Sequence, residues 1–251
     1  MAFSLKGRVA WVTGSTTGLG KAMALELGKA GAKVAINYNN NQARAEASFA
    51  EFKRAGCSGI LVRGNAIDVE QVNAMYAQIS RELGPVDILI PNATPEQPQK
   101  PIEEYDWAFY QSMLDFFVKS PYLLTRACLP HMKKQKWGRI INIGSEVFIR
   151  GVGNFSAYVA AKGAQAGWTR SMANELAPFG ITVNLIAPGW IPVERHENDP
   201  QEQKDAYLKL IPVGHWGKPA DVGAAAVYLA SEEAGFVTGQ SLAVNGGMTV
   251  S

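Results

Sequence analysis

The sequence is poor in the residues that build disulfide and metal sites. Its 251 residues include two cysteines, Cys57 and Cys128, and three histidines, His131, His196 and His215, without CxxC or Cys/His spacing. A disulfide framework or a zinc site normally needs several such residues at short, regular intervals. We therefore expect no metal centre and interpret both cysteines as packing residues.

Long apolar runs and a strong charge of one sign are also missing. No segment approaches the length of about eighteen apolar residues that a membrane span needs, and residues 1–14 contain no signal-peptide stretch. The formal net charge is +2, and the densest basic run, residues 133–136, fits a helix end. These absences predict a cytoplasmic protein that binds neither membranes nor nucleic acid.

The sequence does contain short β-rich apolar runs that alternate with longer helix-like segments. This alternation is typical of a parallel sheet with helices on both faces. We predict an α/β fold, namely a single-domain, Rossmann-type, doubly wound parallel sheet of about seven strands within residues 1–251. The runs are residues 8–13, 33–38, 59–63, 87–91, 138–143, 182–187 and 241–244.

A glycine-rich turn follows the first run. The stretch TGSTTGLG, residues 13–20, leads into a helical pattern that ends at Gly31. Gly14, Gly18 and Gly20 would allow backbone N–H groups at a helix N-terminus to approach an anion closely. The turn therefore favours a dinucleotide diphosphate, and the alternative is a turn that serves only strand–helix packing.

Two further features, a Tyr–Lys pair and a single asparagine, are ambiguous by themselves. Tyr158 and Lys162 lie four residues apart in an alanine-rich run, which places both on one helix face, but such a pair is often only surface packing. Asn65 follows the third run and is suited either to bonding an adenine edge or to forming a turn.

Taken in order, these motifs resemble those of the short-chain dehydrogenase/reductase family over essentially the whole chain, from TGSTTGLG through YVAAK to VNGG. The family's TGxxxGxG and YxxxK patterns are intact, and Ser145 matches its serine thirteen residues before the tyrosine. The resemblance implies an NAD(P)-dependent oxidoreductase that interconverts an alcohol and a carbonyl. Tyr158 would be the acid/base, Ser145 would bond the substrate oxygen, and Lys162 would hold the nicotinamide ribose.

This chemistry sets a requirement on the tyrosine. Hydride transfer at a carbon needs proton transfer at its oxygen. The ordinary pKa of a phenol is about 10, so action near neutrality requires cations that lower the pKa by roughly two to three units. We expect Lys162 and the oxidised nicotinamide ring to provide them.

The resemblance also implies a set of cofactor contacts. Tyr38 stands where an acid would favour NAD, no acid follows before Glu46, and Arg44 is the nearest cation in the sequence, so NADP is favoured over NAD. The implied contacts are Gly14, Ser15, Thr16, Thr17, Gly18, Leu19, Tyr38, Asn39, Asn65, Ala66, Asn92, Ala93, Tyr158, Lys162, Pro188, Gly189 and Ile191.

Three stretches depart from the family pattern. Phe117 falls where the family has a catalytic asparagine, which holds a water that links the lysine to solvent. Pro91 and Thr94 flank Asn92 and Ala93 where the family usually reads NNAG, and Val193 replaces a threonine that would bond the nicotinamide carboxamide. These departures predict weakened cofactor contacts and a slower or rerouted proton relay.

The substrate loop is expected at about residues 190–212. Its polar character suits a small polar alcohol, a sugar or a polyol, and a 3-oxoacyl-type ketone is a further possibility. Each candidate contact is equally suited to being an ordinary solvated residue. The candidates are Glu146, Asn154 and Trp190, with Glu194, Arg195 and His196 beside them.

The resemblance further implies a homotetramer or a dimer. The helices that carry Phe117 and Tyr158 would form one interface, and the C-terminal segment another. Two other functions remain as alternatives: a non-redox enzyme on the same fold, such as a lyase or dehalogenase-like protein, and a protein that senses a dinucleotide without turnover. Thr94, Phe117 and Val193 motivate the first alternative, and Phe117 the second.

Overall fold

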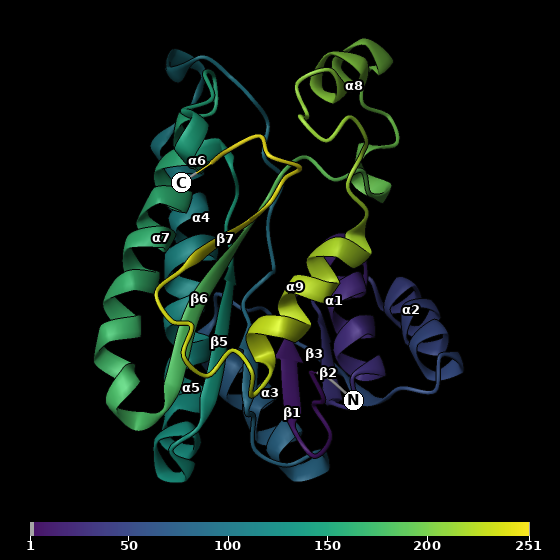
Figure 1. The fold of residues 1–251 in the computed structure, drawn as a ribbon, viewed down its shortest axis with the longest axis vertical. Coiled ribbons are helices and arrows are strands. Elements are labelled where there is room, and N and C mark those ends of the chain that lie inside the picture. Colours follow the sequence, from purple (N-terminus) through teal and green to yellow (C-terminus); the bar gives the residue numbers. More distant parts are fainter. Residues whose placement is uncertain (1–2, 251) are drawn as a thin grey trace.

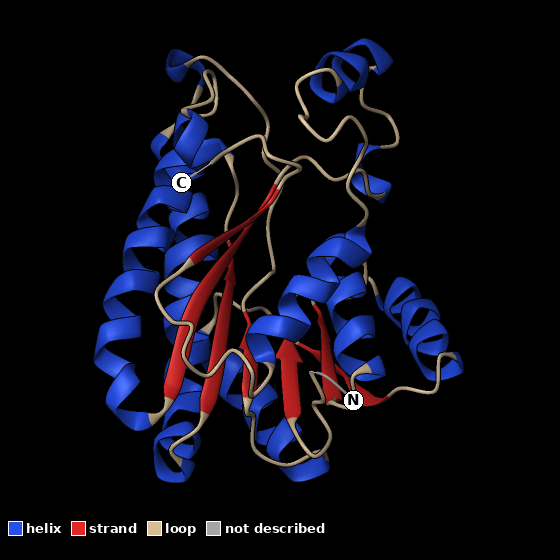
Figure 2. Cartoon of the chain, viewed as in Figure 1, coloured by secondary structure: helices blue, strands red, loops and turns tan. Residues whose placement is uncertain are grey.

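A computed structural model describes residues 3–250 and contains one parallel sheet of seven strands flanked by helices (Figures 1 and 2). Every predicted run forms a strand, and the bounds differ from the prediction by at most one residue at either end. The doubly wound parallel sheet is therefore confirmed. The strands are β1 (Val9–Val12), β2 (Lys33–Tyr38), β3 (Ser58–Arg63), β4 (Ile88–Ile90), β5 (Gly138–Ile143), β6 (Ile181–Pro188) and β7 (Ser241–Val244).

The strands follow the order β3-β2-β1-β4-β5-β6-β7, and all neighbouring pairs are parallel. The chain builds outward from β1 to β3 and then crosses back to place β4 on the other side of β1. At such a reversal the loops that leave neighbouring strands diverge and open a crevice, where sheets of this class bind ligands. The carboxyl ends of β1 and β4 are therefore the place to examine.

Helices cover both faces of the sheet (Figure 1). The helix predicted after the glycine turn ends at Lys29, and Gly31 follows it in the left-handed conformation, with φ of 101°. One face carries α1 (Gly18–Lys29), α2 (Gln42–Arg54) and α9 (Pro219–Ala230), and the other carries α3 (Val69–Glu82), α5 (Ser120–Gln135) and α7 (Ser156–Leu176), with α4 (Trp107–Leu114) against α7. Shorter turns are η1 (Ile102–Glu104), η2 (Asp115–Lys119), α6 (Val147–Arg150) and η3 (Ala177–Phe179).

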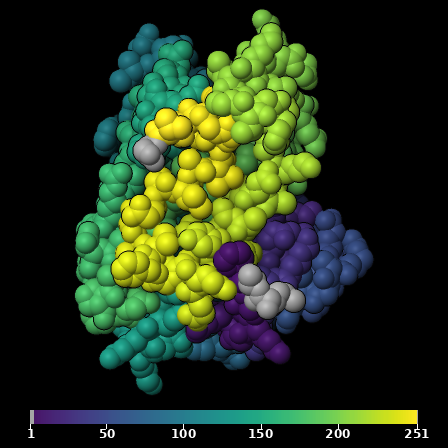
Figure 3. Space-filling view, in the orientation of Figure 1, coloured from purple at the N-terminus to yellow at the C-terminus, as the bar shows by residue number. Residues whose placement is uncertain are grey.

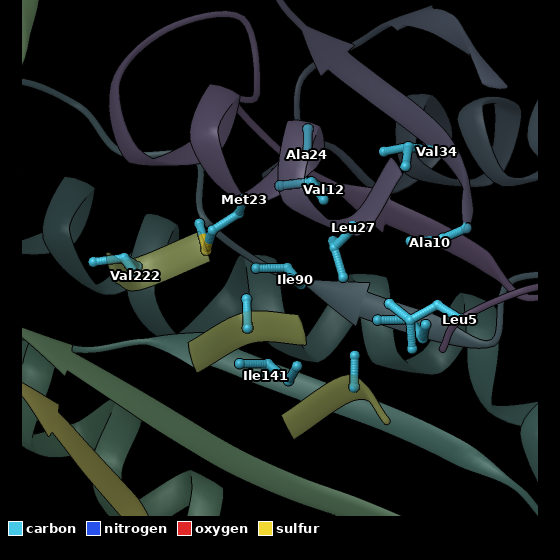
Figure 4. Close-up of a cluster of buried hydrophobic side chains, with 14 of the residues drawn as sticks. Leu5, Ala10, Val12, Met23, Ala24, Leu27, Val34, Ile90, Ile141 and Val222 are labelled. Atoms are coloured by element: carbon cyan, nitrogen blue, oxygen red, sulfur yellow. The ribbon is translucent and has the colours of Figure 1, made fainter. Parts of the chain in front are cut away.

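Alternate residues of β1 face the two helical layers, because successive side chains of a strand point to opposite sides. Val12 packs in one core with Met23 and Leu27 of α1 and with Val222 of α9 (Figure 4). Trp11 packs in the other core, with residues of α3 and α5. Full burial of a large apolar side chain stabilises the fold by roughly 1.5–3 kcal/mol. These two cores fix α1, and the turn before it, against the strand ends.

The expected substrate loop folds into the short turn η4 (Glu194–His196) and helix α8 (Gln201–Leu208). In Figure 1, α8 lies above α9 and apart from the helices on the opposite side of the sheet. The space-filling view shows this segment as a separate prominence at one end of the molecule (Figure 3). The loop therefore lies over the edge of the sheet that is formed by the carboxyl ends of the strands.

Both cysteines are buried free thiols within the two cores, so their interpretation as packing residues is confirmed for Cys57 and Cys128. Within residues 3–250, no helix combines the length and apolar character that crossing a bilayer requires. Over the same range, no three His, Cys, Asp or Glu side chains gather closely enough to bind a metal ion.

Candidate active site

The glycine-rich turn between β1 and α1 is tied to the segment that follows β4. The Thr13 hydroxyl accepts hydrogen bonds from the backbone N–H groups of Asn92 and Ala93, at 2.9 and 3.0 Å. The Asn92 amide donates in return to the carbonyl oxygens of Thr13 and Gly14, at 2.9 and 3.1 Å. The predicted cofactor residue Asn92 therefore holds the turn in place with its side chain.

The other side of the turn is tied to β2. The Ser15 hydroxyl donates to the carbonyl of Val12 at 2.6 Å and accepts from the backbone N–H of Asn37 at 3.0 Å. The Asn37 side chain accepts from the backbone N–H of Gly14 at 3.1 Å. Ser15, predicted as a cofactor contact, thus points its hydroxyl into the sheet. Sequence reasoning missed Asn37, whose only signal was a polar residue inside an apolar strand.

Two glycines of the turn leave no room for a side chain. A Cβ at Gly14 would lie 2.9 Å from the Cα of Ala93, and a Cβ at Gly20 would lie 2.4 Å from the amide nitrogen of Asn92. Gly14 and Gly18 also have φ of 59° and 56°, in the left-handed region. The turn therefore needs glycine for its own packing, and it also presents the N–H groups at the start of α1, which lack an acceptor within the helix.

The N-terminus of α1 holds a carboxylate. The Glu194 side chain accepts a hydrogen bond from the backbone N–H of Gly18 at 3.0 Å, and Val193 packs beside Gly18. Burial raises the pKa of Glu194, but hydrogen bonds from its own N–H and from Gly18 and Thr17, together with the charge of Lys21, bring it below the usual value. The turn thus accepts an anion, which is the property that a dinucleotide diphosphate requires.

Ser145 and Tyr158 meet in a buried position after the carboxyl end of β5. Ser145 follows the strand by two residues, Tyr158 lies in the first turn of α7, and each is 9% exposed. Burial raises the pKa of Tyr158, whereas hydrogen bonding with Ser145 and the positive charge of Arg195 lower it. Burial outweighs these two effects and leaves the pKa of Tyr158 above its usual value. The lowering expected from Lys162 together with the nicotinamide ring stays a prediction.

Lys162 lies one turn after Tyr158 on the same face of α7, as predicted, and is 3% exposed. Its Nζ donates to the carbonyl of Ile143 at 2.5 Å and to Oε1 of Gln165 at 3.2 Å, and lies 5.5 Å from the centroid of the Tyr158 ring. Burial, assisted by the charge of Arg195, lowers the pKa of Lys162 well below its usual range. A ribose contact would require Nζ to exchange one of these protein partners.

Phe117 lies in the π-helical segment η2 between α4 and α5 and is 3% exposed. Its ring centroid is 5.3 Å from that of Tyr158, edge to face, and 3.6 Å from Nζ of Lys162. The residue at the family's asparagine position therefore contacts both predicted catalytic side chains. An aromatic face stabilises an ammonium group, but it does not offer a water the donor and acceptor of an amide.

The predicted adenosine end of the site lies at the carboxyl ends of β2 and β3. Tyr38 is in register with Arg63, and Nε of Arg63 donates to the carbonyl of Asn39 at 3.2 Å. Arg63 is thus a cation beside Tyr38 that sequence reasoning, which pointed to Arg44, did not identify. Only the pairing of two strands brings it there.

Three other positions serve turns or packing. The Asn65 side chain accepts from the backbone N–H of Ile67 at 3.2 Å, which is the turn-forming role held open above. Ala66 is buried in the core beneath α3. The Thr94 hydroxyl donates to the carbonyl of Pro95 at 3.2 Å. The side chains of Asn65 and Thr94 therefore already have local partners.

The segment after β6 is built into the scaffold. The carbonyl of Pro188 accepts from the backbone N–H of Glu146 at 3.1 Å. A Cβ at Gly189 would lie 2.9 Å from the phenol oxygen of Tyr207. Ile191 is 4% exposed and belongs to the core beneath α9. These contacts fix the start of the substrate loop beside the end of β5.

Two of the candidate substrate residues are joined through α8. The Tyr207 phenol donates to Oε1 of Glu146 at 2.6 Å and accepts from the backbone N–H of Trp190 at 2.7 Å. Arg150 also donates to Oε1 of Glu146, at 2.7 Å. Glu146 is 2% exposed, and within the described chain its Oε2 has no hydrogen-bond partner. The network ties α8 to the residue next to the predicted catalytic serine.

The remaining candidates occupy different environments. Asn154 forms an exposed turn before α7, with φ of 55°, and its backbone carbonyl accepts from the backbone N–H of Lys100 at 2.8 Å. Arg195 donates from Nε to Nε2 of His196 at 3.1 Å, and no carboxylate of residues 3–250 lies within ion-pair distance of its guanidinium. Burial, followed by the charge of Arg195, lowers the pKa of His196. Within the described residues, Arg195 is therefore a cation without a carboxylate partner, beside an imidazole whose charged form is disfavoured.

The chain is similar to named enzymes over nearly its whole length. A family model described as Enoyl-(Acyl carrier protein) reductase matches residues 14–249. The 2-dehydro-3-deoxy-D-gluconate 5-dehydrogenase of Formosa agariphila is 35% identical over 249 residues, which cover 98% of this chain and 94% of that protein. The 3-oxoacyl-(acyl-carrier-protein) reductase of Haemophilus influenzae is 38% identical over 249 residues, covering 98% of this chain and 100% of that protein.

A solved structure also matches the fold over nearly the whole chain. The gluconate 5-dehydrogenase of Burkholderia cenocepacia, solved in complex with NADP and tartrate, has a TM-score of 0.91 at 31% identity. The match covers 98% of this chain and 96% of that one.

Proposed function

The chain belongs to the short-chain dehydrogenase/reductase family of oxidoreductases, and we propose that Tyr158 is its acid/base in the NADP-dependent interconversion of an alcohol and a carbonyl. The observation that carries the proposal is the meeting of Ser145, Tyr158 and Lys162 in a buried position after β5. A Tyr–Lys pair of surface packing would be exposed and would have no serine in reach. The solvent-shielded cluster supports catalysis instead.

The proposed chemistry assigns each side chain one task. When bound, the dinucleotide supplies or accepts the hydride. In the reducing direction the neutral Tyr158 phenol donates a proton to the substrate oxygen, and the Ser145 hydroxyl hydrogen-bonds the same oxygen. In the oxidising direction the phenolate accepts that proton. Arg195 favours the phenolate electrostatically, and the nicotinamide cation would add to its effect.

The cofactor contacts follow from the two anion-binding features. The N–H groups at the start of α1 would receive the diphosphate, because they already bind the Glu194 carboxylate. Arg63, beside Tyr38, would face a 2′-phosphate, and no acid at the end of β2 repels it, so NADP is the proposed cofactor. Glu194 must leave the turn when the diphosphate binds.

The substrate that we propose is a small polyhydroxy carboxylate, such as a sugar acid. Arg195 supports it as an unpaired cation whose charge reaches Tyr158 and Lys162. Glu146 and Trp190, joined through Tyr207, would border the hydroxyl groups. Two of the relatives named above act on sugar acids. A 3-oxoacyl substrate, as in the Haemophilus relative, is the second candidate.

Cofactor titration and a substrate screen test this function. In a fluorescence titration, the purified protein should bind NADPH with a lower Kd than NADH. It should also turn over sugar acids faster than the matching uncharged polyols or a 3-oxoacyl thioester. Arg195→Gln should raise KM for a sugar acid and leave KM for its uncharged analogue unchanged. Equal changes in KM for both compounds would mean that Arg195 does not recognise the carboxylate of the substrate.

The alternatives make different predictions in the same assay. A non-redox enzyme with a blocked nicotinamide site would bind neither reduced cofactor, and a sensor would bind one without turnover on any substrate. The glycine turn and the Ser145, Tyr158 and Lys162 cluster support the oxidoreductase instead. Binding together with turnover excludes both alternatives.

We further propose a single catalytic domain in the cytoplasm that assembles as a homotetramer. A depression of about 420 Å³ lies on the surface of α4, η2, α5 and α7, the helices expected to form an interface. A second copy of the chain would cover it. Size-exclusion chromatography with light scattering tests the assembly against the 27.1 kDa of one chain. The lining residues are Gln111, Leu114, Asp115, Val118, Lys119, Tyr122 and Trp168.

A further inference from the structure

Three groups surround the ammonium of Lys162. Nζ lies 2.5 Å from the carbonyl oxygen of Ile143, 3.2 Å from Oε1 of Gln165 and 3.6 Å from the centroid of the Phe117 ring. An ammonium carries three N–H donors, and these three groups are all able to accept one. Gln165 contributes the one polar side chain among them.

Gln165 lies on a buried and anchored part of α7. It follows Lys162 by three residues on α7, so both side chains share a helix face, and it is 1% exposed. The backbone carbonyl of Gln165 accepts from the Thr169 hydroxyl at 2.8 Å, and that hydroxyl accepts from the Asn142 side-chain amide of β5 at 2.9 Å. The helix segment that carries Gln165 is thereby anchored to the strand that precedes Ser145.

The charge of Lys162 depends on such neutral acceptors. A buried ammonium is costly without hydrogen bonds, and no carboxylate of residues 3–250 forms an ion pair with Lys162. The titratable groups that face it are the Tyr158 phenol on α7 and the Arg195 guanidinium from the substrate loop, and the latter disfavours its charge. The hydrogen bond to Gln165 favours the charged form of Lys162, which burial and the charge of Arg195 disfavour.

We propose that Gln165 is a positioning residue for catalysis, which favours the protonated form of Lys162 and holds its ammonium on the face of α7 that carries Tyr158. In the family this part of the site includes an asparagine that holds a water, and Phe117 stands in its place. Here Gln165, the Ile143 carbonyl and the Phe117 ring close around the ammonium instead. The inference rests on the proposed function, because it concerns the lysine beside the proposed acid/base.

Two substitutions of nearly equal volume test this role in opposite directions. Gln165→Met removes the acceptor and should let Lys162 lose its proton at lower pH, by roughly one pH unit for one hydrogen bond to a charged group. Gln165→Glu adds a carboxylate and should move the titration to higher pH. The matched control is Asn174→Leu, an exposed amide farther along α7, which should change nothing.

Two measurements read the outcome. NMR titration of the lysine Cε resonances, with Lys162 identified by its loss in Lys162→Met, follows the ammonium without cofactor or substrate. The pH profile of kcat then shows whether its basic limb moves down in Gln165→Met and up in Gln165→Glu. If neither variant moves the Lys162 titration, or both move it the same way, the inference is wrong.

The design separates this inference from the proposed function. A wild-type protein without turnover would refute the function, while the NMR titration would still decide the role of Gln165. If Gln165→Met does not fold, the Glu variant decides alone: an upward shift supports the role, and an unmoved titration overturns it. A Lys162 titration that shifts while the kcat profile stays fixed also overturns the role in catalysis.

Discussion

Nζ of Lys162 lies 3.6 Å from the centroid of the Phe117 ring, so the site places an aromatic face against its own buried cation. The same ring meets Tyr158 edge to face at 5.3 Å between centroids. Phe117 therefore does more than interrupt a hydrogen-bonded relay. It shields the lysine and the phenol from water and supplies a weak electrostatic partner to the ammonium.

Replacing this ring separates its contribution to stability from its effect on turnover. Phe117→Asn should lower the free energy of unfolding by about 3–5 kcal/mol, because a 3% exposed ring is exchanged for a small polar group. Turnover per folded molecule should stay equal or rise, since the amide restores a hydrogen-bonding site. Denaturant unfolding and active-site titration measure the two quantities. Phe236→Asn, at a fully exposed ring, serves as the control.

Tyr158→Phe should reduce kcat by 100-fold or more, which is roughly the contribution of a general acid or base. The affinity for NADPH should remain within a few fold, because the phenyl ring fills the same space. Tyr76→Phe, which removes a half-buried phenol from α3, is the control and should retain activity. Undiminished turnover in the Tyr158 variant would refute its assignment as the acid/base.

Glu194→Ala should tighten cofactor binding, because the carboxylate on the Gly18 N–H competes with the diphosphate. The interaction of an anion with a helix N-terminus predicts roughly two- to fivefold in Kd. The pKa of Glu194 is lowered, so its charge is complete at neutral pH and the competition weakens only as the pH falls through that lowered value.

A fluorescence titration with NADPH at neutral and acidic pH measures this competition. The neighbouring Glu197→Ala removes an exposed carboxylate of the same loop and is the control. Unchanged or weaker binding in Glu194→Ala would mean that the contact does not oppose the cofactor.

Arg63→Gln should weaken NADPH binding about tenfold or more and leave NADH binding nearly unchanged, because a hydrogen bond to a charged group contributes roughly 1.5–3 kcal/mol. Arg44→Gln tests the cation that the sequence suggested and should have the smaller effect. The ratio of the two dissociation constants in each variant is the measured quantity. A larger effect at Arg44 would place the 2′-phosphate on α2 instead of at the end of β3.

Each part of the site that the sequence determined by itself depends on short spacings within one element. The strand runs fix the layers, and the order of the motifs identified the family. The four-residue spacing of Tyr158 and Lys162 puts both on one face of α7, because a helix repeats every 3.6 residues. The glycines after β1 predicted the anion-binding turn, because few other residues tolerate its backbone and close contacts.

Only the tertiary structure decided which residues from distant segments complete the site. Strand register brought Arg63 beside Tyr38, and the fold of the substrate loop brought Glu194 onto the glycine turn. Packing of α4, η2 and α7 brought the Phe117 ring against Lys162 and Tyr158, and burial raises the pKa of Tyr158. Burial and contacts between elements depend on which distant chain segments pack together, and local spacing in the sequence does not encode this packing.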